Sequence, residues 1–317
     1  METRRRALLV VVGIVSVFLV GRLFVGGNPD APTKPLAVAE ATPAPSPEKR
    51  MAPEKGAAPV EQALPPSGPN GVFKLLSHRA VYDLKLKSAR SNSGVSALEG
   101  RMVMEWTDSC DGSTLNQRIQ TRTYDSDGNA MTTDFRISTW EARDGSSFRF
   151  NAHQETDGQA TEEFIGRGVK DDKGAGDVTY TKPPQGTLKL GAGTLFPSQH
   201  TAAMIKAGMA GKSILTAKVF DGSGPDTAYE AVGAIGKEEP LDDGTSPGAG
   251  AALLKGIRSW PMRLAYFPVG NSDGLPEYEI GFRMYANGVS SNLELDYGDF
   301  TVGGVLNQIE ALPDPGC

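Results

Sequence analysis

The sequence predicts an all-β protein, mainly antiparallel, built as one large curved or barrel-like sheet with a single short helix. Apolar and polar residues alternate through much of the chain after residue 71, as in 80–86, where Tyr82, Leu84 and Leu86 share one face. Tight-turn pairs such as Asp127-Gly128 and Asn287-Gly288 separate these stretches. A dozen or more short strands joined in this way must curl or close to protect their edges.

The expected strands follow one another with few interruptions. They cover 80–86, 101–106, 117–124, 131–141, 146–152, 161–169, 177–181, 214–221, 228–236, 260–268, 276–286, 289–297 and 300–309. A helix over 199–207 breaks the series, with Ser198 as its N-cap and Gly208 or Gly211 as its terminator. Three apolar residues at helical spacing should face the sheet: Ala202, Ile205 and Met209. The Gly-, Pro- and Asp-rich stretch 238–250 predicts an exposed loop.

Residues 1–27 have the layout of an export signal. Arg4, Arg5 and Arg6 precede an unbroken apolar stretch over 7–21, which is typical of a secretory signal peptide. Without cleavage, residues 7–26 would just span a bilayer at about 1.5 Å per residue, with the arginines on the cytoplasmic side. A cleaved signal peptide and a signal anchor both place the rest of the chain outside the cytoplasm. The competing interpretation, a buried helix of a cytosolic protein, fits the flanking charges less well.

The next segment has the composition of a linker. Residues 28–70 hold 11 of the 22 prolines of the chain and no aromatic residue. Such a segment buries too little apolar surface to offset the entropy of ordering it, so we expect a disordered Pro/Ala-rich tether. Residues 71–317 are then the folded domain.

Charge and hydropathy exclude two classes of protein. The chain of 317 residues has a formal net charge of −6 and an isoelectric point near 5.3. Nucleic-acid binders carry a basic footprint, so no nucleic-acid partner is expected. The mean hydropathy of −0.29 excludes a protein that crosses the membrane many times.

The two cysteines, Cys110 and Cys317, predict one disulfide bond in an exported protein. The bond would close a loop of 208 residues, for which chain entropy gives an upper figure of about 5 kcal/mol. It would fasten the carboxyl end of the chain to the turn that contains Cys110. The alternative is a pair of free thiols.

The sequence shows no arrangement typical of an enzyme. The histidines His78, His153 and His200 lack the spacing of a zinc site, and no Gly-x-Ser-x-Gly elbow is present. Asp125 begins a stretch that resembles a calcium loop, but position twelve is Arg136 instead of glutamate, so we expect a hairpin turn there. We therefore expect a protein without catalytic residues, metal or cofactor.

Aromatic and methionine residues within the expected strands have two interpretations. The first is ordinary core packing in a curved sheet. The second is an apolar concavity, inside a wall too wide to fill itself, that accepts an acyl chain or a peptide. The residues expected to line such a cavity are Met102, Met104, Trp106, Trp260 and Phe282.

Several short motifs resemble one known family when taken in order. They are Ser77-His78-Arg79-Ala80-Val81-Tyr82-Asp83-Leu84, Glu105-Trp106, Cys110-Asp111-Gly112, Phe196-Pro197-x-x-His200, Phe220-Asp221-Gly222-Ser223, Trp260-Pro261, Pro276-Glu277-Tyr278-Glu279, Asn287-Gly288-Val289-Ser290, Leu295-Asp296-Tyr297-Gly298-Asp299-Phe300 and Cys317. This series resembles the envelope integrity protein B (EipB) family of alphaproteobacterial periplasmic proteins, long described as a domain of unknown function.

The resemblance implies a monomeric periplasmic β-spiral of about 14 strands, a disulfide between Cys110 and Cys317, and a role in maintaining the cell envelope. It also suggests a tetratricopeptide-repeat protein as a partner. The protein would be free in the periplasm or tethered to the inner membrane by residues 7–26.

Three functions remain open at this point. The first is a non-enzymatic envelope factor that binds a protein or lipid partner. The second is a carrier or chaperone for lipid or acylated cargo. The third, less favoured, is an envelope hydrolase with an unconventional site.

Overall fold

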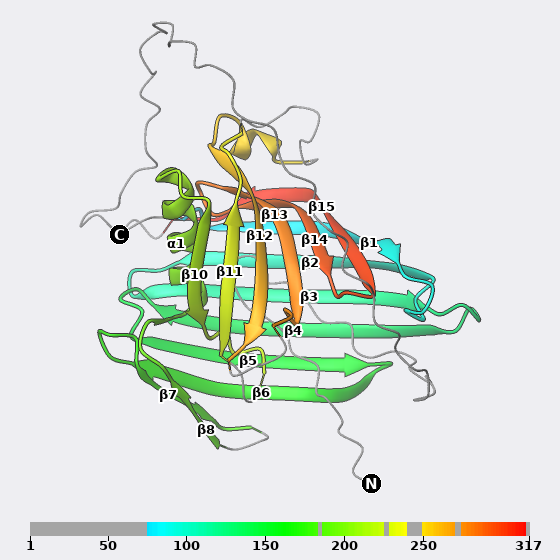
Figure 1. Ribbon diagram of the computed structural model, residues 1–317, viewed down its shortest axis with the longest axis horizontal. Coiled ribbons are helices and arrows are strands. Elements are labelled where there is room, and N and C mark those ends of the chain that lie inside the picture. Colours follow the sequence, from blue (N-terminus) through cyan, green and yellow to red (C-terminus); the bar gives the residue numbers. More distant parts are fainter. Residues whose placement is uncertain (1–74, 183–185, 225–227, 240–248, 270–273, 315–317) are drawn as a thin grey trace, which may run out of the picture.

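The computed structural model describes residues 75–182, 186–224, 228–239, 249–269 and 274–314. These residues form fifteen strands, one α-helix and one short 3₁₀ helix (Figure 1). The elements are β1 (His78–Ala89), β2 (Ala97–Asp108), β3 (Gly112–Tyr124), β4 (Ala130–Ala142), β5 (Ser147–Thr156), β6 (Gln159–Lys170), β7 (Gly176–Tyr180), β8 (Gly186–Leu190), β9 (Thr194–Leu195), α1 (Pro197–Met209), β10 (Ile214–Val219), β11 (Tyr229–Ile235), η2 (Ala251–Leu254), β12 (Ser259–Pro268), β13 (Tyr278–Tyr285), β14 (Ser290–Asp296) and β15 (Phe300–Ala311).

All fifteen strands belong to one sheet, in the order β8-β7-β6-β5-β4-β3-β2-β1-β15-β14-β13-β12-β11-β10-β9. Neighbours are antiparallel except β9 and β10, which are parallel. The first strand pairs with the last, from His78 opposite Ala311 to Ala89 opposite Phe300. The predicted class is confirmed, with fifteen strands where about 14 were expected.

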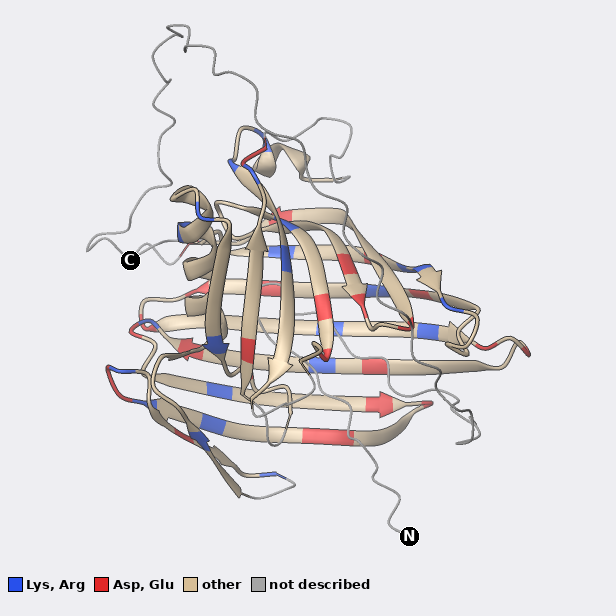
Figure 2. Ribbon diagram, in the orientation of Figure 1, with Lys and Arg blue, Asp and Glu red and all other residues tan. Residues whose placement is uncertain are grey.

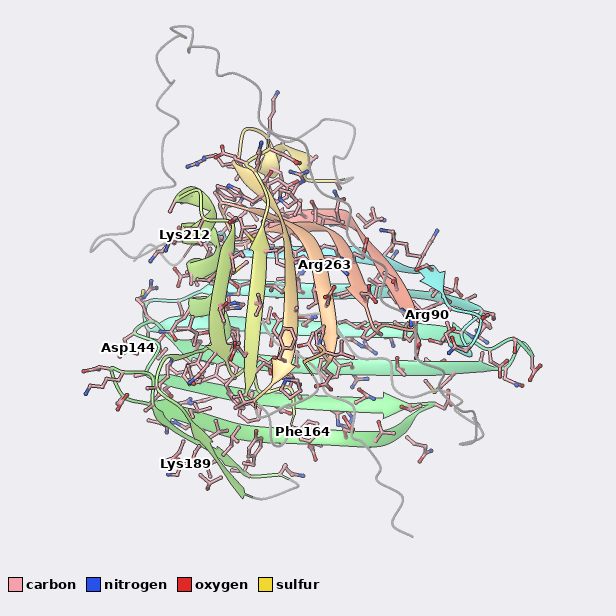
Figure 3. The ribbon with its side chains drawn as sticks, in the orientation of Figure 1. Arg90, Asp144, Phe164, Lys189, Lys212 and Arg263 are labelled. Carbon is pink, nitrogen blue, oxygen red and sulfur yellow. The ribbon has the colours of Figure 1, made fainter. Side chains whose placement is uncertain are left out.

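The sheet folds back on itself so that its two halves face each other. In Figure 1 the long strands β2–β6 run across the picture, and β10–β14 cross steeply in front of them. One continuous hydrophobic core joins residues of both halves. Phe164 of β6, labelled in Figure 3, is 7% exposed and belongs to this core.

Alternation along the strands decides which residues enter the core. In β2, Met102, Met104 and Trp106 are buried, whereas Arg101 is exposed. This is the two-residue period that a half-buried strand requires. The face predicted for this stretch is confirmed.

The helix begins earlier than predicted. Its N-cap is Phe196, and Pro197 occupies the first helical position, so the prediction of Ser198 as N-cap is wrong. Proline suits this position because its fixed φ is helical and it has no N–H to satisfy. Ser198 lies one residue further in, where its backbone N–H donates to Glu141 of β4 instead.

The predicted terminator Gly211 ends the helix. It has a positive φ of 68°, and its N–H donates to the carbonyl of Gly208 at 2.9 Å. The N–H of Lys212 donates to the carbonyl of Ala207 at 3.0 Å, which completes a Schellman motif. Of the three residues expected to face the sheet, Ile205 is fully buried, while Ala202 and Met209 are half-buried.

The stretch that resembles a calcium loop is a hairpin turn, as predicted. It joins β3 to β4, and Gly128 adopts a φ of 82° that favours glycine. Asp125 Oδ1 accepts the backbone N–H groups of Asp127 at 2.9 Å and Asn129 at 2.8 Å. The carboxylate therefore stabilises the turn itself.

The expected export signal and linker, residues 1–70, lie outside the described residues, and so does most of the expected loop 238–250. None of the helices in the described ranges is both long and apolar enough to cross a bilayer.

Candidate functional site

An open pocket of about 420 Å³ lies where the first turns of α1 meet the ends of β2, β3 and β4. It is bordered by polar and charged side chains and by one tryptophan. Those used below are Trp106, Ser113, Glu141, Arg143, Ser198, Gln199 and Lys206. Concave sites with a few convergent polar groups are the usual place for a ligand, so this pocket is the first candidate.

Glu141 forms the floor of the pocket. It lies on the inner face of β4 and is 4% exposed. Its Oε2 accepts the backbone N–H of Ser198 at 2.7 Å, and its Oε1 accepts that of Gln199 at 3.1 Å. These are N–H groups of the first helical turn, which have no partner within the helix. Glu141 therefore fastens the positive end of α1 to the sheet.

Burial dominates the ionisation of this carboxyl group. Desolvation raises the pKa of Glu141 to about 7, although the hydrogen bonds from Ser198 and Gln199 and the charge of Lys170 act to lower it. The charged and neutral forms are thus close in free energy near neutral pH.

Lys170 fastens the other side of the same helix end. Its Nζ donates to Oε1 of Gln199 at 2.5 Å and to the carbonyl of Thr194 at 2.7 Å, and it lies 4.0 Å from the ring centroid of Phe196. Desolvation lowers the pKa of Lys170 to about 8, against the charge of Glu141. Both ionisable groups at this site therefore hold the helix in place.

The two serines of the pocket contact each other, and neither has a histidine partner among the described residues. Ser113 Oγ and Ser198 Oγ lie 2.9 Å apart. In the described ranges no histidine is hydrogen-bonded to either hydroxyl. His200 is buried one turn into the helix, its Nε2 has no partner in those ranges, and burial lowers its pKa to about 4. The geometry is that of a structural contact between strand and helix.

The five residues expected to line an apolar cavity all lie in the core. Met102, Met104 and Trp106 come from β2, Trp260 from β12 and Phe282 from β13, and they are 1–5% exposed. Trp106 also borders the pocket beside α1. Side chains of the core pack against all five, so cargo would have to displace neighbours, and a cargo cavity here stays a prediction.

Sequence reasoning missed Glu141 and Lys170. Each is an ionisable residue at an inward position of a strand: Glu141 follows Ile137 and Thr139 on one face of β4. The sequence did contain a signal for each of them: a charged residue stands at a position where the two-residue alternation predicts a buried side chain. What each residue contacts depends on α1, which begins 56 residues after Glu141 and 27 residues after Lys170 in the chain.

Cys110 lies in the turn between β2 and β3. Arg143 holds this turn, because its Nε donates to the carbonyl of Cys110 at 3.0 Å and its Nη2 to Asp108 at 2.8 Å. The described ranges contain no free cysteine. Cys317 lies outside them, so the pairing of the two residues stays a prediction.

The sheet register places the end of β2, which precedes Cys110, near the end of β15, which precedes Cys317. His78 of β1 lies opposite Trp106 on one side and Ala311 on the other. Strands β2 and β15 thus flank β1 about 10 Å apart, and both run past the same end of it. The six residues that follow Ala311 are enough to cover that distance.

Comparison with known proteins identifies the family. The EipB-like family model matches residues 69–313. The chain belongs to the EipB-like family. Another EipB-like protein, the cell envelope integrity protein EipB of Brucella abortus (strain 2308), is 35% identical over 240 residues, which cover 75% of this chain and 84% of that protein. The resemblance predicted from sequence motifs is confirmed.

A solved structure of an EipB-like relative has the same fold. The crystal structure of a β-barrel-like protein of domain of unknown function DUF1849 from Brucella abortus superposes with a TM-score of 0.70 at 34% identity. The match covers 76% of this chain and all of that one.

Glu141 gives the fold a pH dependence with a definite sign. Because its folded pKa of about 7 exceeds the ordinary value of 4.5, the folded state binds more protons between these values, and its stability falls as pH rises through them. Replacing Glu141 by glutamine removes this fall. In urea unfolding, the stability advantage of the parent over Glu141→Gln should be larger at pH 5 than at pH 8. An advantage that grows toward pH 8 would mean that the carboxylate is already ionised at pH 5.

Proposed function

We propose that this protein supports the integrity of the cell envelope from the periplasm by binding a protein or lipid partner, without catalysing a reaction. The name of the Brucella abortus relative supports the envelope role. The engagement of Glu141 and Lys170 supports the absence of chemistry, because both groups are occupied in holding α1. A general acid or base must be able to reach a substrate.

A partner would bind to the outer face of the sheet, because side chains of the core fill the space on its inner face. Besides the pocket at α1, a wide groove of about 1090 Å³ lies over β1, β2, β3 and β15. Charged residues such as Lys85 and Arg101 border it together with Val305, which is 65% exposed. Surfaces that combine exposed apolar and charged groups suit protein recognition. A tetratricopeptide-repeat periplasmic protein is one such partner, and the chain itself would be a monomer.

A carrier of lipid or acylated cargo is the second candidate, and one observation favours it. In the described ranges the sheet begins at β8 and ends at β9, and these end strands are not hydrogen-bonded to each other. Residues 191–193 join these two strands, and the N–H of Gly193 donates to the carbonyl of Lys173 at 2.7 Å, but in the described ranges no strand pairing closes the sheet along this seam. Parting it would expose the core that contains Trp260 and Phe282.

Two measurements test this function. Deleting the gene from its bacterium should lower survival in detergent, and the plasmid-borne gene should restore it; unaltered survival of the deletion strain would overturn the proposal. Native mass spectrometry of the protein purified from the periplasm should then show a bound protein or lipid. Bound lipid would favour the carrier, and a protein partner would favour the binding factor.

A further inference from the structure

The outer face of the sheet carries two pairs of arginines placed directly opposite each other on neighbouring strands. Arg118 of β3 lies opposite Arg136 of β4, and Arg149 of β5 lies opposite Arg167 of β6. All four are exposed. Like charges directly opposite each other destabilise a sheet, so each pair calls for an anion between its members.

The first pair has its anion within the chain. Asp134 Oδ2 accepts Nη2 of Arg118 at 2.6 Å and Nη2 of Arg136 at 2.7 Å, and its Oδ1 accepts Nε of Arg118 at 3.0 Å. Burial acts to raise the pKa of Asp134, but the two guanidinium groups outweigh it and lower the pKa to about 2. One carboxylate therefore satisfies two arginines on facing strands.

Among the described residues, no such carboxylate lies between the members of the second pair. Neither Arg149 nor Arg167 forms an ion pair with any residue in the described ranges. Figure 2 shows basic positions side by side on β5 and β6. Further along this row, the next outward residue is Thr179 on β7.

An aromatic and an aliphatic side chain border this second pair. The guanidinium of Arg149 lies 5.0 Å from the ring centroid of Trp140, which is opposite it on β4 and half-buried. Val169, the next outward residue after Arg167 on β6, is 48% exposed. Two cations without an ion-pair partner in the described ranges thus lie side by side on the outer face of the sheet, between apolar groups.

We propose that Arg149 and Arg167, beside Trp140, bind the carboxylate of an acidic side chain on a partner protein. The assignment rests on the proposed binding function and names one contact of it. The ligand chemistry follows from Asp134, a side-chain carboxylate that already satisfies the equivalent pair. Tryptophan and arginine are also the residues that most often dominate protein–protein binding energy.

An anionic membrane surface fits these observations less well. Attraction to anionic lipid is worth about 1 kcal/mol for each basic residue near the surface. Two arginines on a chain of net charge −6 would therefore contribute little attraction to an anionic membrane. A single carboxylate held by two guanidinium groups needs no extended basic surface.

The test is an NMR titration of the isotope-labelled full chain with the peptide acetyl-Gly-Asp-Gly-amide, against acetyl-Gly-Asn-Gly-amide as the neutral match. We expect a saturable shift of the Trp140 indole N–H with the aspartyl peptide alone. The indoles of Trp106 and Trp260, which are 4% and 1% exposed, should stay in place. Equal responses to the two peptides, or no response to either, would overturn the site.

Variants tie the response to the arginines. The double variant Arg149→Gln/Arg167→Gln should bind the aspartyl peptide about tenfold or more weakly than the parent, because charge-assisted hydrogen bonds are lost. Arg122→Gln is the matched control: Arg122 is exposed on the same face, lies over Tyr124 at 5.4 Å and faces Thr132 instead of another arginine. It should leave the response unchanged. A double variant that binds like the parent would contradict the assignment.

The folding and function of the double variant separate this site from the proposed function. Its Tm should equal or slightly exceed that of the parent, since a like-charge contact is removed, while detergent survival should fall. If the double variant shows no peptide response but still gives full detergent survival, the proposed role of this site is wrong, whereas the envelope function is not contradicted. Binding to phosphatidylglycerol vesicles that is lost in the double variant, with no peptide response, would instead assign the arginines to the membrane.

Discussion

Replacing Trp260 by alanine should lower the free energy of unfolding by about 3–5 kcal/mol, the range for large aromatic residues in a core. Trp260 of β12 is 1% exposed, and its ring packs against α1 so closely that a Cβ on Gly208 would lie 2.9 Å from its Cδ2. The substitution therefore leaves a cavity between the helix and the sheet. Urea unfolding followed by circular dichroism measures the loss.

Trp140 provides the matched control. It is also a strand tryptophan, but it lies half-buried on the outer face. Trp140→Ala should lower the free energy of unfolding by about 1 kcal/mol, because water can fill the space of the lost side chain and no cavity is left. Equal losses in the two variants would contradict the placement of Trp260 between the helix and the sheet.

Removing either cysteine should lower the free energy of unfolding by about 2–5 kcal/mol in non-reducing buffer. The predicted bond holds the end of the chain beyond β15, whose neighbour Leu312 still donates its N–H to the carbonyl of Ser77 at 2.8 Å. Without the bond, this end is free to fray from β1. Thermal unfolding of Cys110→Ser and of the parent, each with and without reductant, measures the effect.

Three comparisons check that the loss comes from one bond. Cys317→Ser should match Cys110→Ser, and the double variant should lose nothing further. Reductant should bring the parent down to the variants. Equal melting of the parent with and without reductant would show two free thiols.

Much of the sheet can be predicted from local sequence patterns. The alternation in β2 and the Asn287-Gly288 and Asp127-Gly128 turns specify strand faces and hairpins without reference to the rest of the chain. Strands β8 and β9 were not predicted. β9 has two residues and exists only because it pairs in parallel with β10, a contact that no local pattern encodes.

The candidate site was less predictable for the same reason. The helix stretch itself was found, but Ser198 was given the capping role that Phe196 and Pro197 take. The groups that anchor this helix end, Glu141 and Lys170, come from strands far away in the sequence. The two arginines without an ion-pair partner in the described ranges likewise become visible only when the register places Arg149 opposite Arg167.

The central claim, binding without chemistry, is tested most directly by pairing detergent survival with Tm for variants of three buried or half-buried ionisable groups. The set is Glu141→Gln, His200→Gln and Glu162→Gln, where Glu162 is a half-buried residue of β6 whose pKa desolvation raises to about 7. All three parent residues have the shifted pKa values that an enzyme would use. We expect every variant that keeps the parent Tm to restore survival fully. A variant that keeps the parent Tm and fails to restore survival would contradict the account, because its group would then act in the function beyond holding the fold.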